Sequence, residues 1–127
     1  MLTLAQLQAN RPLLNKIDWQ MTPEKAVEMY LEWGTGWVRG HDFVAGRNDE
    51  SYYFVLFDWE KPYVTLIRRT VEGAEELAKI AVPDELFEAA WRDDGSRPGG
   101  SVHRLNHDLK KYLEKILHTP PVDFSIN

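Results

Sequence analysis

The stretch EWGTGWVRGHDF, residues 32–43, holds the densest group of side chains in this sequence that could do chemistry. It places two tryptophans on either side of a Gly-Thr-Gly link and continues into Arg39, His41 and Asp42. Aromatic walls with a guanidinium at the rim are typical of sites that bind anionic organic molecules. An arginine from a later strand can complete such a site. The candidate ligand-binding residues are therefore Trp33, Trp37, Arg39, His41, Asp42 and Arg68.

The same stretch also has the features of a structural corner. Gly34 and Gly36 tolerate backbone angles that are closed to other residues, so a helix can end there abruptly. Trp33 would then belong to the last helical turn, and Trp37 to an extended segment that follows. We favour this structural interpretation over the ligand site, and we expect most aromatic side chains to stabilise the core.

The adjacent residues His41 and Asp42 are poorly placed to act together, because neighbours on an extended chain point to opposite faces. A histidine–carboxylate pair at His41 would need another acid, such as Glu32 or Asp58. The sequence has no Gly-x-Ser-x-Gly turn and no phosphate-binding P-loop motif. It therefore predicts no catalytic residue, and we lean toward a protein that is not an enzyme.

Two further histidines, His103 and His107, have the i, i+4 spacing that places two imidazoles on one helical face. However, His103 precedes the expected start of a helix, so the two would not share it, and we expect both to be surface or capping side chains. The sequence contains no cysteine, which excludes disulfides, thiolate nucleophiles and cysteine-ligated metals. No metal site and no cofactor are predicted.

The composition indicates one globular domain over residues 1–127. Apolar residues make up 43% of the chain, which excludes a disordered polypeptide, and the length is enough to bury a core. The formal net charge of −5 opposes broad attraction to nucleic acids or anionic membranes. No apolar run approaches the roughly 20 residues of a membrane span, and the start lacks a secretory signal pattern. We therefore expect a cytoplasmic protein with no nucleic-acid or membrane partner.

The stretch SYYFVLFDWEKPYVTLIRRT, residues 51–70, predicts an antiparallel hairpin at the centre of a sheet. Both faces of its first strand are apolar, which is typical of a strand that is covered on both sides. The residues WEKP form the expected turn. A four-residue turn would place Arg68 opposite Tyr53 and Arg69 opposite Tyr52.

Helices are predicted on both sides of this hairpin along the chain. Thr3 can cap a short first helix that Pro12 interrupts, and a longer helix begins at Thr22 and ends at Gly34. After the hairpin, residues 74–82 fit either a strand or a helix, and we favour a third strand.

Two helices complete the expected fold, which is α+β. One covers residues 84–93, with Leu86, Phe87, Ala90 and Trp91 facing inward, and the other covers 106–117 with Asn106 as its cap. We thus expect a small antiparallel sheet of three to four strands, with the central hairpin 51–70, packed with an N-terminal helix pair and C-terminal helices.

Several of these short motifs resemble those of a small family of uncharacterised cytoplasmic proteins common in anaerobic sulfate-reducing bacteria. The likeness covers residues 13–117. It rests on Trp19, Thr22-Pro23-Glu24, Trp33-Gly34, Ser51-Tyr52-Tyr53-Phe54 and Arg68-Arg69. That family has no assigned activity, so the resemblance implies a cytoplasmic, anaerobic setting and no functional residue.

Two functions remain open on the sequence. The first is a non-enzymatic domain that acts through self-association, as in a homo-oligomer, or through a protein partner. It would use exposed aromatic residues together with an acidic stretch at 72–94 and a basic stretch at 102–118. The alternative is a small-molecule binding protein or enzyme that holds an anionic ligand around residues 33–42.

Overall fold

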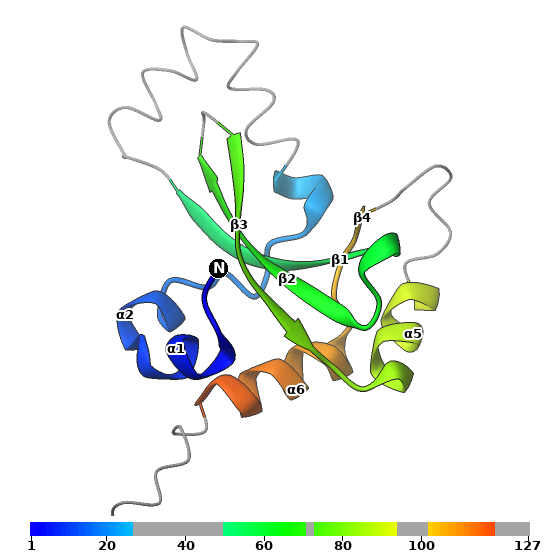
Figure 1. Ribbon diagram of the computed structural model, residues 1–127. Helices are drawn as coiled ribbons and strands as arrows, with labels where there is room; N and C mark the ends of the chain where they lie inside the picture. The colour runs from blue at the N-terminus through cyan, green and yellow to red at the C-terminus, as the bar shows by residue number, and fades with distance from the viewer. Residues whose placement is uncertain (27–49, 71–72, 94–101, 119–127) are drawn as a thin grey trace, which may run out of the picture.

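A four-stranded antiparallel sheet lies at the centre of the fold, with the strands in the order β3-β2-β1-β4 (Figure 1). The strands are β1 (Ser51–Phe57), β2 (Tyr63–Thr70), β3 (Gly73–Ala81) and β4 (Val102–His103). The computed structural model describes residues 1–26, 50–70, 73–93 and 102–118. The predicted third strand is confirmed, and β4 is a short strand that was not predicted.

The central strand β1 is buried on both faces, as its sequence predicts. Tyr52, Phe54 and Leu56 pack into the larger of two hydrophobic clusters. Tyr53 and Val55, which alternate with them, pack into a smaller cluster on the opposite face. The alternation of large apolar side chains therefore builds two layers of core on a single strand.

The connection between β1 and β2 differs from the predicted turn by one residue. A short 3-10 helix, η1 (Asp58–Glu60), begins directly after β1, so the connection runs from residue 58 to residue 62. As a result, Arg68 lies opposite Tyr52, whereas we predicted Tyr53 as its partner. The prediction was wrong because Asp58 belongs to η1 and not to β1. The connection is therefore one residue longer, and every cross-strand pair in the hairpin is shifted by one position.

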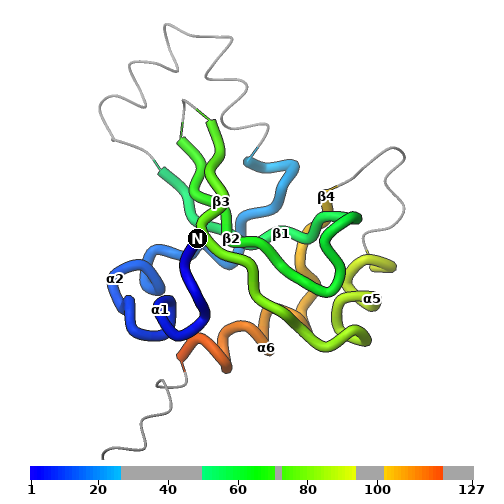
Figure 2. The backbone as a smooth tube through the Cα atoms, viewed as in Figure 1, coloured from blue at the N-terminus to red at the C-terminus, as the bar shows by residue number. Residues whose placement is uncertain are grey.

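Four helices gather on one side of the sheet and cover the face that carries the larger cluster (Figures 1 and 2). The helices are α1 (Leu4–Ala9), α2 (Arg11–Leu14), α5 (Asp84–Asp93) and α6 (His107–His118). Figure 2 shows the chain passing from β4 into α6, so this strand leads directly into the helical layer. The fold is thus α+β, with a helix pair before the hairpin and helices after it.

The predicted helix caps are present. Thr3 and Gln6 form a reciprocal capping box at the start of α1. Asn106 Oδ1 accepts a hydrogen bond from the backbone N–H of Leu109 at 2.9 Å. Thr22 accepts one from the backbone N–H of Lys25 at 3.1 Å, so a helical turn begins there as predicted. The predicted continuation of that helix toward Gly34 lies outside the described ranges.

Helix α5 departs from the prediction at one position. Phe87 and Ala90 are buried, and Leu86 packs against the same cluster. Trp91, which we predicted to face inward, is 43% exposed. Its indole N–H donates a hydrogen bond to Asp58 Oδ1 at 2.7 Å. Because this acceptor lies at the surface, the hydrogen bond keeps the ring partly exposed.

Within the described ranges, no helix is long and apolar enough to cross a membrane.

Candidate functional site

The predicted ligand site around residues 33–42 falls largely outside the part of the chain that the structure describes. Arg68 lies within it, on β2. The other five predicted residues, Trp33, Trp37, Arg39, His41 and Asp42, lie outside it. The site therefore stays a prediction, and Arg68 is the member whose surroundings are known.

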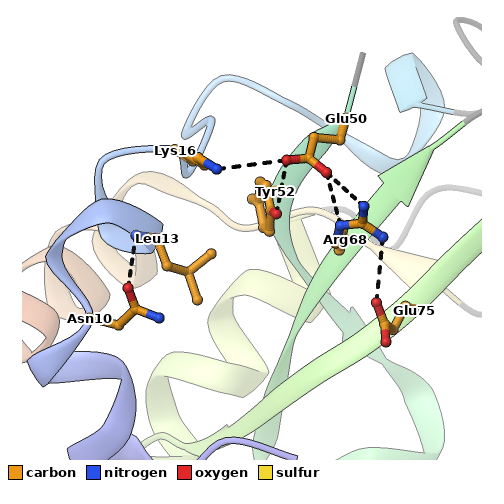
Figure 3. A network of polar contacts seen from close by, with 7 residues as sticks. All are labelled: Asn10, Leu13, Lys16, Glu50, Tyr52, Arg68 and Glu75. Carbon is orange, nitrogen blue, oxygen red and sulfur yellow. Dashed lines mark hydrogen bonds and ion pairs between the residues drawn. The ribbon is translucent and has the colours of Figure 1, made fainter. Parts of the chain in front are cut away.

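Arg68 is held between two carboxylates (Figure 3). Its Nε and Nη2 atoms lie 2.9 Å and 2.7 Å from Glu50 Oε2, and Nη1 lies 3.6 Å from Glu75 Oε1. The second oxygen of Glu50 accepts a hydrogen bond from the Tyr52 hydroxyl at 3.1 Å and lies 3.7 Å from Lys16 Nζ. Three segments of the chain, which contain Lys16, Glu50 with Tyr52, and Arg68, therefore meet at one carboxylate.

The charges in this network stabilise one another. The hydrogen bond from Arg68 is the largest effect that lowers the pKa of Glu50, followed by the hydrogen bond from Tyr52. Hydrogen bonds to Tyr52 and Glu50 raise the pKa of Arg68. An anionic ligand at Arg68 would have to compete with two carboxylates, so this guanidinium serves mainly to connect β2 with residue 50 and with β3.

A second polar cluster brings together Asp58, Trp91 and His103 at the opposite end of β1. The side chain of His103 is 3% exposed, and its Nε2 lies 2.5 Å from Asp58 Oδ1. The same oxygen accepts the hydrogen bond from Trp91, and the Trp91 and His103 rings meet edge to face at 6.0 Å. Our expectation that His103 is a surface or capping side chain was wrong, because β4 places it next to Leu56 in the sheet.

The direction of this hydrogen bond follows from the chemistry of its two atoms. A carboxylate oxygen accepts hydrogen bonds, so the contact corresponds to the tautomer of His103 in which the N–H at Nε2 is the donor and Asp58 Oδ1 is the acceptor. The histidine is buried, while the side chain of Asp58 is 40% exposed. The cluster thus holds the Asp58 carboxylate in a fixed orientation at the surface. Catalytic histidine–carboxylate dyads have the reverse arrangement, in which a buried acid orients an exposed histidine.

The oriented carboxylate lines a pocket of about 370 Å³. The pocket lies between the turn that follows β1 and helix α5, and it is lined by Asp58, Lys61, Phe87, Glu88 and Trp91. Lys61 Nζ donates a hydrogen bond to Glu88 Oε1 at 2.8 Å. This contact raises the pKa of Lys61 and lowers the pKa of Glu88. The pocket thus combines two carboxylates and one ammonium with the rings of Phe87 and Trp91.

Two exposed aromatic side chains flank the same turn. Trp59, in η1, is 66% exposed, and Tyr63, at the start of β2, is 43% exposed. The Trp59 ring stacks on Phe57 with centroids 4.9 Å apart and an angle of 20° between the rings. The residues 57–63 therefore present large apolar surfaces to solvent at one end of the sheet.

The sequence contains a weak signal for this end of the molecule. Asp58 is the first charged residue after seven residues of strand, and from the sequence we considered it only as an acid for His41. His103 lies 45 positions away in the sequence. Only the pairing of β4 with β1 brings the two together.

Among the residues in the described ranges, no group of three or more histidine, aspartate or glutamate side chains is placed to hold a metal ion. Comparisons of the chain with protein-family models, with curated proteins and with solved structures find no match.

Proposed function

We propose that this chain is a non-enzymatic domain that acts by associating with a second copy of itself or with a partner protein. The carrying observation is Trp59, a large aromatic side chain that is 66% exposed at the end of the sheet. The cytoplasmic location and the membership of the family common in sulfate-reducing bacteria, both expected from the sequence, belong to the same proposal.

The surroundings of Trp59 support its use as an anchor. Tryptophan, tyrosine and arginine are the residues that most often dominate the binding energy of protein interfaces. The stacking of Trp59 on Phe57 restricts the indole before any partner arrives, which lowers the entropy cost of binding. Tyr63 adds a second exposed ring on the same connection.

The β3 edge of the sheet favours contact through side chains over the addition of a further strand. Leu2 forms a bridge to Ala78 on the outer side of β3, and its N–H donates to the backbone oxygen of Leu77 at 2.8 Å. The remaining outer part of β3 carries Glu75 and Glu76, and charges on an edge strand oppose pairing with another strand. Association is therefore expected at the exposed rings.

The experiment that tests self-association is sedimentation velocity from low micromolar to hundreds of micromolar protein. We expect the mass to rise with concentration, and we expect Trp59→Ala to lower the association constant by about tenfold or more, as for other tryptophan anchors. Leu4→Ala is the matched control, because Leu4 is an exposed apolar residue on α1, away from the turn.

Association with a partner is tested in the native cell by placing a photo-crosslinking residue at position 63, where Tyr63 is exposed and Trp59 is retained, and, as a control, at position 4. We expect crosslinked species from position 63 alone. A chain that stays monomeric at every concentration and forms no crosslink from position 63 would reject the proposal.

A further inference from the structure

We infer that the pocket between Asp58 and helix α5 binds an alkylammonium group, either of a small organic amine or of a lysine side chain. The inference does not depend on the association proposed above, because Trp59 is not among the residues that line the pocket. It rests on the orientation of Asp58, on the aromatic walls, and on an ammonium group of the chain itself that one wall already holds.

Asp58 has one oxygen committed to the protein and one left for a ligand. Oδ1 accepts hydrogen bonds from Trp91 Nε1 at 2.7 Å and from His103 Nε2 at 2.5 Å. Within the described ranges, Oδ2 has no hydrogen-bond partner. Because the donors come from two separate elements, α5 and β4, the carboxylate keeps one orientation and needs little reorganisation when a cation arrives.

This arrangement favours an ammonium over a guanidinium. A guanidinium binds best to both oxygens of a carboxylate at once, through two parallel hydrogen bonds. Oδ1 of Asp58 already accepts two donors, so that geometry is blocked. An ammonium is a compact charge that needs a single acceptor oxygen, and it can complete its contacts with water or with Glu88.

The walls of the pocket suit an ammonium on an apolar stem. Trp91, which is 43% exposed, provides aromatic surface that can pack against methylene groups and attract a cation near the ring face, while Phe87 is 2% exposed and adds a small apolar area to the lining. Lys61 Nζ already donates to Glu88 Oε1 at 2.8 Å, so one wall of this pocket holds an ammonium that belongs to the chain. A volume of about 370 Å³ lies at the lower end of the range for small-molecule sites.

The test uses the full chain, labelled with ¹⁵N, and follows the indole N–H resonance of Trp91 by NMR while n-butylammonium is added. Trp91→Phe assigns that resonance. We expect a saturable shift, because this N–H is bonded to the same carboxylate that the amine contacts. n-Butanol, which has the same stem without the charge, is expected to cause a much smaller shift.

Three variants locate the binding. Asp58→Asn keeps an acceptor oxygen and removes the charge, and we expect it to weaken n-butylammonium binding about tenfold. Glu85→Gln removes one charge from an exposed position on α5 that does not line the pocket, and it is expected to bind as the wild type does. Lys61→Met removes the competing ammonium from Glu88, so it is expected to bind n-butylammonium more tightly.

A damaged fold cannot increase the affinity for n-butylammonium. The Lys61→Met variant therefore tests the inference even if Asp58→Asn unfolds the protein. The inference is wrong if n-butylammonium and n-butanol shift the resonance equally, or if Lys61→Met binds no more tightly than wild type. A parallel titration with Nα-acetyl-lysine methylamide separates the two sources. If Nα-acetyl-lysine methylamide binds as tightly as n-butylammonium or more tightly, a lysine side chain is identified as the ligand. If n-butylammonium alone binds, a small organic amine is identified.

Discussion

At the scale of single residues, Glu50 and Asp58 show how one carboxylate can be used in two ways. Glu50 meets Arg68, Tyr52 and Lys16, and both of its oxygens are engaged within the protein. Asp58 is oriented through one oxygen and presents the rest of its carboxylate to a pocket. The first residue therefore contributes to stability, and the second is placed to contact a ligand.

The Glu50 network predicts a specific response of stability to pH. Because Arg68 lowers the pKa of Glu50 in the folded state, the native protein binds fewer protons at this site than the unfolded chain does. The contribution of Glu50 to the free energy of unfolding is complete above the pKa that Glu50 has in the unfolded chain. It is lost as the pH falls through the lower pKa that Glu50 has in the folded protein. We expect Glu50→Gln to remove this part of the acid sensitivity, measured by urea unfolding between about pH 7 and about pH 3.

Glu114→Gln serves as the control, since it removes one acidic charge from an exposed position of α6. The free energy of unfolding of Glu50→Gln should be lower than wild type near neutral pH, and the two should converge in acid. Curves that stay parallel over the whole range would show that Glu50 does not contribute in this way.

At the scale of elements, the start of α6 links two helices. Asn106 Oδ1 caps α6 through the N–H of Leu109 at 2.9 Å, while Asn106 Nδ2 donates to Asp93 Oδ2 at the end of α5 at 2.8 Å. One side chain thus satisfies a helix terminus and connects it to the neighbouring helix. Because β4 lies just before this cap, the position of α6 is set by the sheet and by the helical layer together.

This cap predicts a moderate loss of stability on substitution. We expect Asn106→Ala to lower the free energy of unfolding by about 1 kcal/mol, the usual effect of losing an N-cap. Asn106→Ser keeps an oxygen for the cap but loses the reach to Asp93, so it should fall between the alanine variant and wild type. Guanidinium unfolding measures all three, and an alanine variant as stable as wild type would contradict the role of the cap.

At the scale of the whole molecule, stability depends on the larger cluster between the sheet and the helices. It draws side chains from α1, α2, α5, α6 and the three long strands. Leu109 of α6 and Leu56 of β1 are both fully buried within it. Removing a side chain there therefore affects contacts made by segments from both ends of the chain.

Leu109→Ala is expected to lower the free energy of unfolding by about 2–5 kcal/mol, which is the cost of a buried cavity of this kind. The loss should appear as one cooperative transition in circular dichroism and in tryptophan fluorescence, because the cluster joins α1, α2, α5 and α6 to the sheet. The exposed Leu4→Ala gives the reference for removing the same atoms at the surface, where little change is expected. A similar small change for both variants would place Leu109 outside the core.

Much of this fold could be predicted from local patterns in the sequence. The alternation of apolar residues over 51–57 determines that β1 is buried on both sides, since successive side chains point to opposite faces. Thr3 and Asn106 determine where two helices begin, because their side chains satisfy the first free N–H groups. Each of these features depends on residues within one turn or one strand of each other.

Only the tertiary structure decided the site at the end of the sheet. Asp58 and His103 are 45 positions apart, and no local pattern indicates that a two-residue strand will pair with the end of β1. The exposure of Trp91 was also decided there, because its indole N–H finds an acceptor outside the core. Hydrogen bonds between distant segments depend on strand register, and a shift of one residue changes which side chains meet.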